Sequence, residues 1–338
     1  MARAQRDDVA PAFIGEGSYG CVVQPPEPCI SREVTNGRSS GPAVVAKIMT
    51  RQNAFEKEWQ VAHVAAAIDP KQKHIIYPTM ACEIAKPAGD DPRMHMCDFQ
   101  DSSAELTHFY QLRMTYGGPD LEKFMKTSTC NGSTFLKIMK SALAGAALFA
   151  KAGYCHQDIK ANNIVVKNDR AMLIDNNLSQ RLKHLFTKQN ARRLNHEYFI
   201  HPPEYRLAIL TLKLAETDDP DFGAYRSILR NISQIGRPEF FSIFHDRTQF
   251  QIDALECFKW MKGGGDLTEY ADRMDVYSLG VTVIDMWRHI KFTADERVKL
   301  VPKLVDLIRL MTSADPRKRP TPSGAYRRWS AMSKKMEK

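Results

Sequence analysis

The sequence predicts an α+β protein with two lobes, a small strand-rich N-terminal lobe and a larger, mainly helical C-terminal lobe. Two observations lead to this prediction. Short apolar segments bounded by Gly and Pro crowd the first third of the chain, whereas long segments with helical spacing of apolar residues dominate after residue 132. The character changes near residues 116–119. We therefore divide the chain into residues 1–117 and 118–338.

The N-terminal lobe should contain mostly strands and one main helix. Residues 12–23, AFIGEGSYGCVV, predict two strands joined by a glycine turn. A Pro-, Ser- and Gly-rich excursion follows, and residues 43–49, AVVAKIM, predict a short buried strand that carries one lysine. Apolar residues then recur at helical spacing over residues 53–68 and stop at Asp69-Pro70.

The C-terminal lobe should begin with a long helix. Residues 133–151 are rich in Ala and Leu, and Gly153 ends the pattern. Residues 163–166 and 171–174, NIVV and AMLI, are β-prone and are separated by KNDR, which predicts a hairpin. Later segments such as 275–287 and 301–316 again predict helices with at least one apolar face.

The net charge of +9 is concentrated at the C-terminal end. Residues 317–338 hold eight Lys and Arg against one acid, Glu337, which gives 8 − 1 = +7. Such a basic tail predicts a solvated surface. Binding of nucleic acid through the tail is the less favoured alternative.

The seven cysteines are odd in number, scattered and without a CxxC pair. They predict reduced thiols, with neither a disulfide framework nor a metal site. The N-terminus lacks the apolar core of a signal peptide, and no apolar run approaches eighteen residues, so we expect no membrane span. We therefore expect an intracellular monomer.

Several polar residues, which are costly to bury, lie beside the predicted hairpin. Asp158 and Asn163 precede its first strand, and Asp175 follows its second. A hairpin brings these positions to one end, where two carboxylates and an amide converge. Oxygen ligands of this kind suit Mg²⁺, which is usually shared between one or two carboxylates and substrate phosphates. The sequence thus predicts a metal and phosphate site.

The same residues carry a resemblance to a known family. HQDIKANN, residues 156–163, resembles the H-R-D-x-K-x-x-N catalytic loop of eukaryotic-type protein kinases, and IDNN, 174–177, stands where their D-F-G follows. Upstream, GEGSYGCV resembles G-x-G-x-x-G-x-V, and VVAK resembles V-A-I-K. Downstream, HPPEY, DVYSLG and DPRKRPT resemble three later elements, at Glu204, Asp275 and Arg319. The resemblance covers residues 13–325.

The resemblance implies a bilobal protein-kinase fold and roles for particular residues. Asp158 would be the catalytic base, and Lys160 would neutralise charge on the transferred phosphate. Lys47 would hold the α- and β-phosphates of ATP, oriented by Glu58, with Glu56 as the rival. Asn163 and Asp175 would bind Mg²⁺. The nucleotide-binding residues would be Gly15, Gly17, Gly20, Val22, Lys47, Met114 and Tyr116.

Other matches imply structural roles. Glu204 and Arg319 should form a buried ion pair, and His156 should brace the catalytic loop. Asp275 should cap a helix and bond back to that loop.

The sequence departs from the family at three places. Gln157 replaces an arginine that reads a phosphorylated activation loop, so activation by loop phosphorylation is not expected. Asn176 and Asn177 replace Phe and Gly, and the apolar packing of that Phe should be lost. Residues 206–270 form most of an insertion that we expect to be helical, either docking a partner or merely covering the helical lobe.

Three functions follow for comparison. The first is a Ser/Thr protein kinase that uses Mg-ATP and a protein hydroxyl acceptor. The second is a pseudokinase or ATP-binding scaffold that acts through residues 206–270. The third is a small-molecule phosphotransferase, against which the later elements argue. The divergent turns also resemble kinases of large DNA viruses, which would place the protein in the host cytoplasm or nucleus or in a virion.

Overall fold

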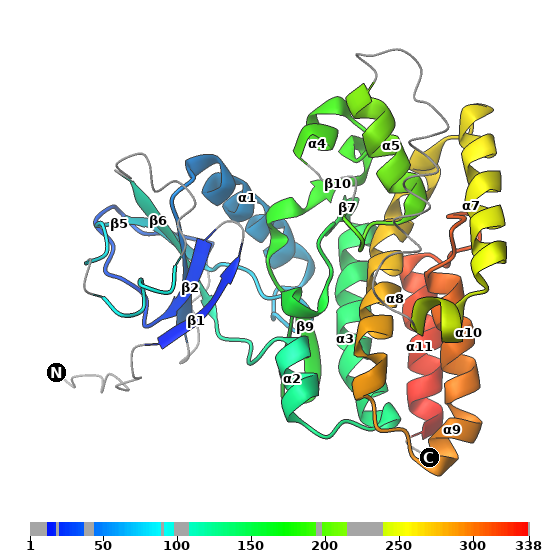
Figure 1. Cartoon of the computed structure of the whole chain (residues 1–338). Helices are drawn as coiled ribbons and strands as arrows, with labels where there is room; N and C mark the ends of the chain where they lie inside the picture. The colour runs from blue at the N-terminus through cyan, green and yellow to red at the C-terminus, as the bar shows by residue number, and fades with distance from the viewer. Residues whose placement is uncertain are drawn as a thin grey trace. The chain divides into compact units, whose positions relative to one another are not determined.

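The computed structural model describes residues 12–17, 20–36, 44–88, 91–97, 108–193, 198–214 and 239–336. These residues form two compact units (Figure 1). Unit 1 holds the described residues up to Gln72, with Ile76–Gly117 and Asp175–Asn177. Unit 2 holds Lys73–Ile75, Gly118–Ile174 and the described residues from Leu178 onward. A sheet dominates unit 1 and helices dominate unit 2, so the predicted α+β class is confirmed.

Unit 1 is built on a six-stranded antiparallel sheet with the strand order β1-β2-β4-β6-β5-β3. Its strands are β1 (Ala12–Gly17), β2 (Gly20–Gln24), β3 (Val34–Thr35), β4 (Val44–Met49), β5 (Met80–Ile84) and β6 (Phe109–Thr115). Gly20 begins β2 with φ +153°, and a Cβ there would overlap the carbonyl oxygen of Ile48. Only glycine allows β2 to approach β4 so closely.

The predicted helix of unit 1 is α1 (Gln52–Ile68), the blue helix of Figure 1. Its inner face is small and apolar, because Ala54, Val61, Ala62 and Ala65 are buried. Phe55 and Trp59 pack beside the sheet residues Met49 and Leu112. The hydrophobic periodicity read from the sequence therefore places α1 against the sheet.

The cysteines of unit 1 overturn the prediction of reduced thiols. Cys21 is bonded to Cys97, and Cys29 is bonded to Cys82. The paired cysteines are 76 and 53 residues apart, so the local spacing of cysteines in the sequence does not indicate these disulfides. Cys130, Cys155 and Cys257 are free and buried. Reduced cysteines were one reason to expect an intracellular protein, and the two disulfides remove that reason.

Unit 2 is mainly helical. Its longer helices are α2 (Leu121–Thr127), α3 (Gly132–Lys151), α4 (Lys188–Arg193), α5 (Pro203–Leu214), α7 (Arg247–Lys262), α8 (Met274–Met286), α9 (Ala294–Lys299), α10 (Val301–Met311) and α11 (Pro322–Met336). Its short strands are β7 (Tyr154–Cys155), β8 (Ile164–Lys167), β9 (Arg170–Leu173) and β10 (Gln180–Arg181). Short 3₁₀ or π turns cover Ala161–Asn163, Leu182–His184, Phe240–Phe244, Leu267–Arg273 and Trp287–His289. A further 3₁₀ turn, Asn176–Leu178, begins in unit 1.

Helix α3 is the central helix of unit 2. The side chain of Asn131 caps its N-terminus by accepting a hydrogen bond from the backbone N–H of Thr134, 2.8 Å away. Gly153, with φ +76°, follows its C-terminus as predicted. In the part of the chain that the structure describes, this is the one helix long and apolar enough to cross a membrane, and 61% of its most apolar 18-residue stretch is buried in the fold. It therefore gives weak evidence for a membrane span.

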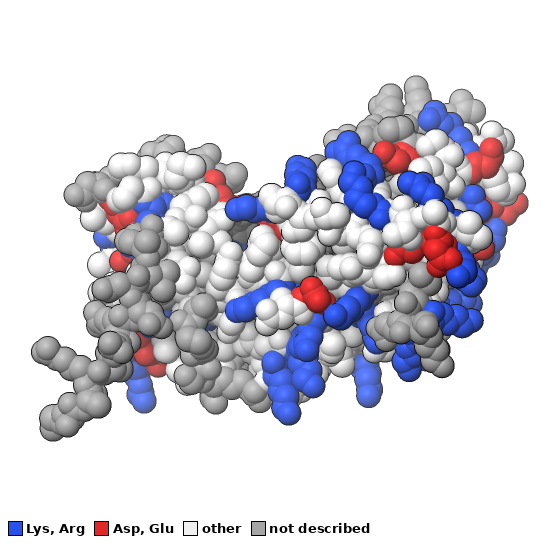
Figure 2. All heavy atoms as spheres, turned by 90° about the horizontal axis from the view of Figure 1, so that it is seen from below, with Lys and Arg blue, Asp and Glu red and all other residues white. Residues whose placement is uncertain are grey.

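The basic C-terminal region ends in a packed helix, and most of its basic side chains are exposed, as predicted for a solvated surface. Residues 322–336 form α11, which packs against α3, and the indole of Trp329 is buried and donates to the carbonyl of Leu136 at 2.8 Å. Arg319 is buried, and Arg317 pairs with Asp315. Exposed basic residues remain on α11, namely Arg327, Arg328, Lys334 and Lys335. In the face shown in Figure 2, Lys and Arg are spread over the helical part and form no single patch.

The predicted hairpin and the predicted helices of the insertion are both present. β8 and β9 pair antiparallel, and Asn168 and Asp169 between them have φ +50° and +54°. Two left-handed residues in a two-residue loop match the twist of the hairpin. In the insertion, α5 and α7 confirm the helical prediction, while residues 215–238 lie outside the described residues.

Candidate functional site

Three charged residues of unit 1 meet at Lys47. Its ammonium nitrogen lies 2.8 Å from Glu58 Oε2 and 2.8 Å from Asp175 Oδ1. The three residues come from β4, from α1 and from the turn after β9, and Lys47 and Glu58 are buried. Glu58 is therefore the partner of Lys47. The rival Glu56 is exposed on α1 and accepts a hydrogen bond from Gln52.

The two carboxylates keep Lys47 charged. Burial alone would lower the pKa of Lys47, but the negative charges of Asp175 and Glu58 outweigh it and raise the pKa above its ordinary value. A buried cation held at two points is suited to bind an anionic ligand such as a polyphosphate.

The predicted nucleotide-binding residues lie on, or directly after, four strands of unit 1. Gly15 and Gly17 belong to β1, where a Cβ at Gly15 would meet nothing within 4 Å. Val22 on β2 is the register partner of Lys47 on β4. Met114 lies on β6, and Tyr116 follows that strand. Residues 18 and 19, at the tip of the glycine turn, lie outside the described residues.

In the turn after Asp175, polar contacts stand where the sequence predicts that the packing of a Phe is lost. Asp175 itself is left-handed with φ +58°, and the two asparagines that follow are buried. Asn177 Nδ2 donates to Glu58 Oε2 at 3.1 Å, and Asn176 Nδ2 lies 3.4 Å from the carbonyl of Ile76. Polar contacts therefore occupy the region where only a loss of apolar packing was expected.

The polar motif at residues 156–163 forms a second cluster, in unit 2. Asn163 Nδ2 donates to Asp158 twice, to the carbonyl oxygen at 2.9 Å and to Oδ2 at 2.6 Å. Lys160 Nζ lies 3.3 Å from Asp158 Oδ1. The three residues fit in one tight loop because a 3₁₀ turn, Ala161–Asn163, leads directly into β8. The motif read from the sequence is thus one compact polar group.

Sequence reasoning missed Tyr198. Its hydroxyl donates to Asp158 Oδ1 at 2.6 Å and lies 2.8 Å from Lys160 Nζ. The available signal was a hydroxyl-bearing residue shortly before HPPEY, but nothing in the spacing fixes its partner.

Buried hydrogen bonds hold the loop in place. Asp275 on α8 accepts from the backbone N–H of His156 at 2.7 Å and of Gln157 at 3.1 Å, as predicted. It stands in the first turn of α8 rather than at the cap, which is Arg273. His156 Nε2 lies 3.0 Å from the carbonyl of Ile174, so the histidine braces the loop.

Gln157 is the centre of a neutral network. Its Oε1 accepts from the Tyr205 hydroxyl at 2.6 Å and from Asn190 Nδ2 at 3.2 Å. Its Nε2 donates to the carbonyl of Leu178 at 2.7 Å. Where the family's arginine would meet a phosphate, uncharged partners already occupy this side chain.

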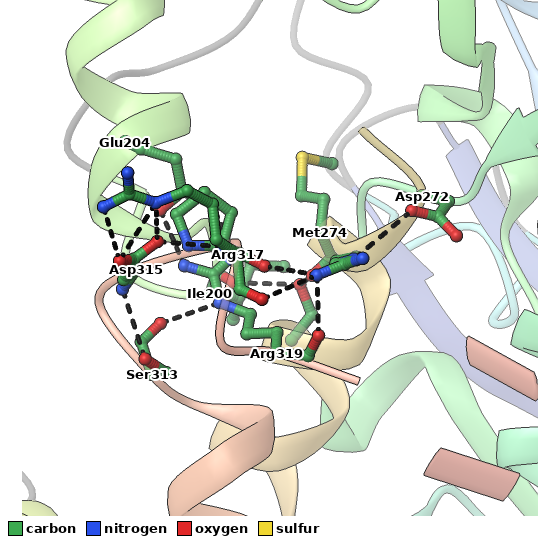
Figure 3. A network of polar contacts seen from close by, with 11 residues as sticks. Ile200, Glu204, Asp272, Met274, Ser313, Asp315, Arg317 and Arg319 are labelled. Atoms are coloured by element: carbon green, nitrogen blue, oxygen red, sulfur yellow. Dashed lines mark hydrogen bonds and ion pairs between the residues drawn. The ribbon is translucent and has the colours of Figure 1, made fainter. Parts of the chain in front are cut away.

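The predicted ion pair between Glu204 and Arg319 is confirmed. Arg319 Nη1 and Nη2 donate to the two carboxylate oxygens at 2.6 and 2.7 Å, and both side chains are buried (Figure 3). Arg319 Nε also donates to the carbonyl of Ser313 at 2.7 Å. Arg273 Nη1 adds bonds to three carbonyls of residues 316–319. This network fastens α5 to the segment before α11.

The two predicted Mg²⁺ ligands lie in different units, Asn163 in unit 2 and Asp175 in unit 1. Asn163 donates its amide nitrogen to Asp158, so its amide oxygen is the atom suited to a metal, and Asp175 carries a carboxylate. Among the described residues, no three His, Cys, Asp or Glu side chains gather as a metal site. Carboxylate and amide oxygens are each ligands of the type that Mg²⁺ takes, together with several waters and oxygens of substrate phosphates.

Comparison with known proteins adds nothing to this geometry. No model of a known protein family matches the sequence, and no curated protein matches it either.

Proposed function

We propose that this protein is a Ser/Thr protein kinase that transfers the γ-phosphate of Mg-ATP to a protein hydroxyl group. The observation that carries the proposal is Lys47 held between Glu58 and Asp175, two residues 11 and 128 positions away in the sequence. The kinase resemblance names these three residues independently of any contact. Their meeting in unit 1 supports the resemblance.

The residues of unit 1 would bind and orient the nucleotide. Lys47, fixed by Glu58, would hold the α- and β-phosphates, and Gly15 and Gly17 would let the backbone of β1 approach them. Asp175 of unit 1 and, as the kinase resemblance implies, Asn163 of unit 2 would be ligands of Mg²⁺, which, when bound, neutralises phosphate charge.

The residues of unit 2 would handle the acceptor. As the acceptor oxygen bonds to the γ-phosphorus and the bond to the ADP oxygen breaks, Asp158 would receive the hydroxyl proton. Lys160 would stabilise the negative charge on the transferred group. Asn163 holds Asp158 through the two hydrogen bonds described above, so its carboxylate is already oriented.

A second candidate is the pseudokinase or ATP-binding scaffold. The observation that favours it is the replacement of Phe and Gly after Asp175 by Asn176 and Asn177. All the predicted catalytic and metal residues are nevertheless present. A partner docked on the insertion at residues 206–270 remains a prediction of either function.

Transfer of labelled γ-phosphate from Mg-ATP to generic protein substrates, followed by phosphoamino-acid analysis, tests the proposal. We expect label on Ser and Thr with the intact protein and none with Asp158→Asn. Asp169→Asn is the matched control, because Asp169 is an exposed carboxylate in the turn between β8 and β9, the hairpin that follows Asp158. No transfer, with Mg-ATP still raising the unfolding temperature, would favour the pseudokinase.

A further inference from the structure

The turn that carries the proposed metal ligand is joined to helix α1 by one side chain. Asn177 Nδ2 lies 3.1 Å from Glu58 Oε2, and the same oxygen accepts from Lys47 Nζ at 2.8 Å. Strand β4, helix α1 and the turn 175–177 therefore meet at a single carboxylate oxygen. All three segments belong to unit 1.

Burial makes this contact important. Glu58 and Asn177 are each 2% exposed, so water cannot replace a missing donor at the Glu58 carboxylate. A hydrogen bond to a buried charged group is stronger than one between neutral groups, and losing the donor leaves the charge undersolvated. The amide of Asn177 thus stabilises the carboxylate that orients Lys47.

We propose that Asn177 is a positioning residue that fastens the turn of Asp175 to α1 through Glu58. This inference rests on the proposed function, because Lys47 and Asp175 are taken there as the phosphate and metal ligands. It assigns Asn177, a departure from the family pattern, a role that a glycine at this position lacks the side chain to perform. The turn would hold Asp175 toward Lys47 by a polar bond instead of apolar packing.

The neighbouring asparagine supplies a matched control. Asn176 is 1% exposed and belongs to the same turn, but its bond to the carbonyl of Ile76 is long, at 3.4 Å. Its Oδ1 has no hydrogen-bond partner among the described residues. Replacing Asn176 by Leu therefore removes little, whereas replacing Asn177 by Leu removes the bond to Glu58 with the same change in volume.

The experiment compares Asn177→Leu with Asn176→Leu in three measurements on the full chain: Mg-ATP affinity, kcat and KM, and hydrogen exchange of backbone amides. For Asn177→Leu we expect Mg-ATP affinity and kcat/KM for ATP to fall about tenfold or more. Amides of α1 near Glu58 and of the turn should exchange faster. Asn176→Leu should stay within about twofold of wild type in affinity and kinetics.

A double-mutant cycle separates positioning from simple stability. If Asn177 acts through Glu58, the loss caused by Asn177→Leu should largely disappear in a Glu58→Gln background, since the charge that needs the donor is gone. A merely structural role would lower the unfolding temperature without moving the KM for ATP, and its effect would add to that of Glu58→Gln.

The outcomes are distinct. If the wild-type protein transfers phosphate and the two Leu variants behave alike, the inference is overturned while the proposed function stands. If the wild-type protein binds Mg-ATP without transfer, the proposed kinase function fails, and a selective loss of affinity in Asn177→Leu would still support the inference. A wild-type protein that does not bind Mg-ATP would overturn both.

Discussion

The hydroxyl of Tyr198 donates a 2.6 Å hydrogen bond to Asp158 Oδ1, an oxygen of the proposed catalytic base. Lys160 Nζ lies 2.8 Å from the same hydroxyl, so the phenol joins the base to the cation beside it. Asp158 is therefore oriented from two sides, by Asn163 on one oxygen and by Tyr198 on the other.

Replacing Tyr198 by Phe should lower kcat for phosphoryl transfer about tenfold, because a hydrogen bond to a charged group contributes roughly 1.5–3 kcal/mol. The KM for ATP should change little, since the hydroxyl contacts the base and not the proposed nucleotide-binding residues. Steady-state kinetics with varied protein substrate and varied ATP measure this. Tyr154→Phe is the control, because the Tyr154 hydroxyl accepts a hydrogen bond from Arg181, an exposed residue. An unchanged or higher kcat would contradict the prediction.

Activity should not require a phosphorylated activation segment. Gln157 is hydrogen-bonded to Tyr205, Asn190 and Leu178, and glutamine has no positive charge with which to bind a phosphate. Treatment with a broad phosphatase, confirmed by mass spectrometry, should leave kcat/KM within about twofold. A large loss that is restored by incubation with Mg-ATP would show that this prediction is wrong.

The same network should contribute to folding stability. Gln157→Leu keeps the approximate size of the side chain but removes the acceptor of the Tyr205 hydroxyl and the donor to the Leu178 carbonyl, whereas Asn190 keeps its other bonds. We expect the free energy of unfolding to fall by about 2–3 kcal/mol. Urea denaturation gives the value, and Gln180→Leu, at a less buried glutamine of the same unit, should have a much smaller effect.

Breaking the Glu204–Arg319 pair should be severely destabilising. Both side chains are buried, so Glu204→Gln leaves an uncompensated guanidinium and should cost about 3–5 kcal/mol. The exposed pair Lys299–Asp295 offers a contrast, because Asp295→Asn should cost less than about 1 kcal/mol. Urea unfolding of the two variants measures both values. Equal losses would mean that burial does not set the strength of the pair.

Stability should fall as the pH drops toward 5. Burial, helped by the charges of Arg206 and Lys160, lowers the pKa of His201 to about 4, although its bond to the carbonyl of Gln157 opposes this. In the unfolded chain the same imidazole binds a proton near pH 6.5, so stability is full above that value and is lost as the pH falls from about 6.5 to 4. At about pH 5 the loss from this group should be ~2 kcal/mol.

The measurement is urea unfolding at neutral pH and at about pH 5. His201→Gln keeps a donor that can serve the carbonyl of Gln157 but does not titrate, so the loss between the two pH values should be smaller in this variant. His245 has a pKa lowered in the same way, to about 4, and contributes a separate loss. A pH dependence unchanged by His201→Gln would contradict the assignment to His201.

The elements that local pattern controls were predictable from the sequence. The hairpin of β8 and β9, the end of α3 at Gly153 and the face of α1 that carries Glu58 all follow from turn chemistry and helical spacing. Glu58 could be chosen over Glu56 because it lies on the apolar side of the helix. The motif order also placed Glu204 with Arg319 before any contact was known.

Contacts between distant side chains were not predictable. Nothing in the sequence pairs Cys21 with Cys97, and nothing tells that the amide of Asn177 reaches Glu58, because such partners depend on how separate elements pack. Arg319 was counted as part of a solvated basic tail and also matched to a buried pair, and the structure bears out the second role. Charge counted along the chain cannot tell a surface arginine from a buried one.

The packing of α11 on α3 has a consequence for how the chain is made. Trp329 donates a hydrogen bond to Leu136 across 193 residues, so the ribosome completes α3 long before α11, the helix that packs against it. At roughly 5–20 residues per second, the nascent chain carries α3 without that cover for about 10–40 s. During this interval the face of α3 that α11 later covers is exposed, and exposed hydrophobic surface makes a partly folded chain prone to aggregation. Translation that stops before residue 320 would make this state permanent and should yield an aggregating product.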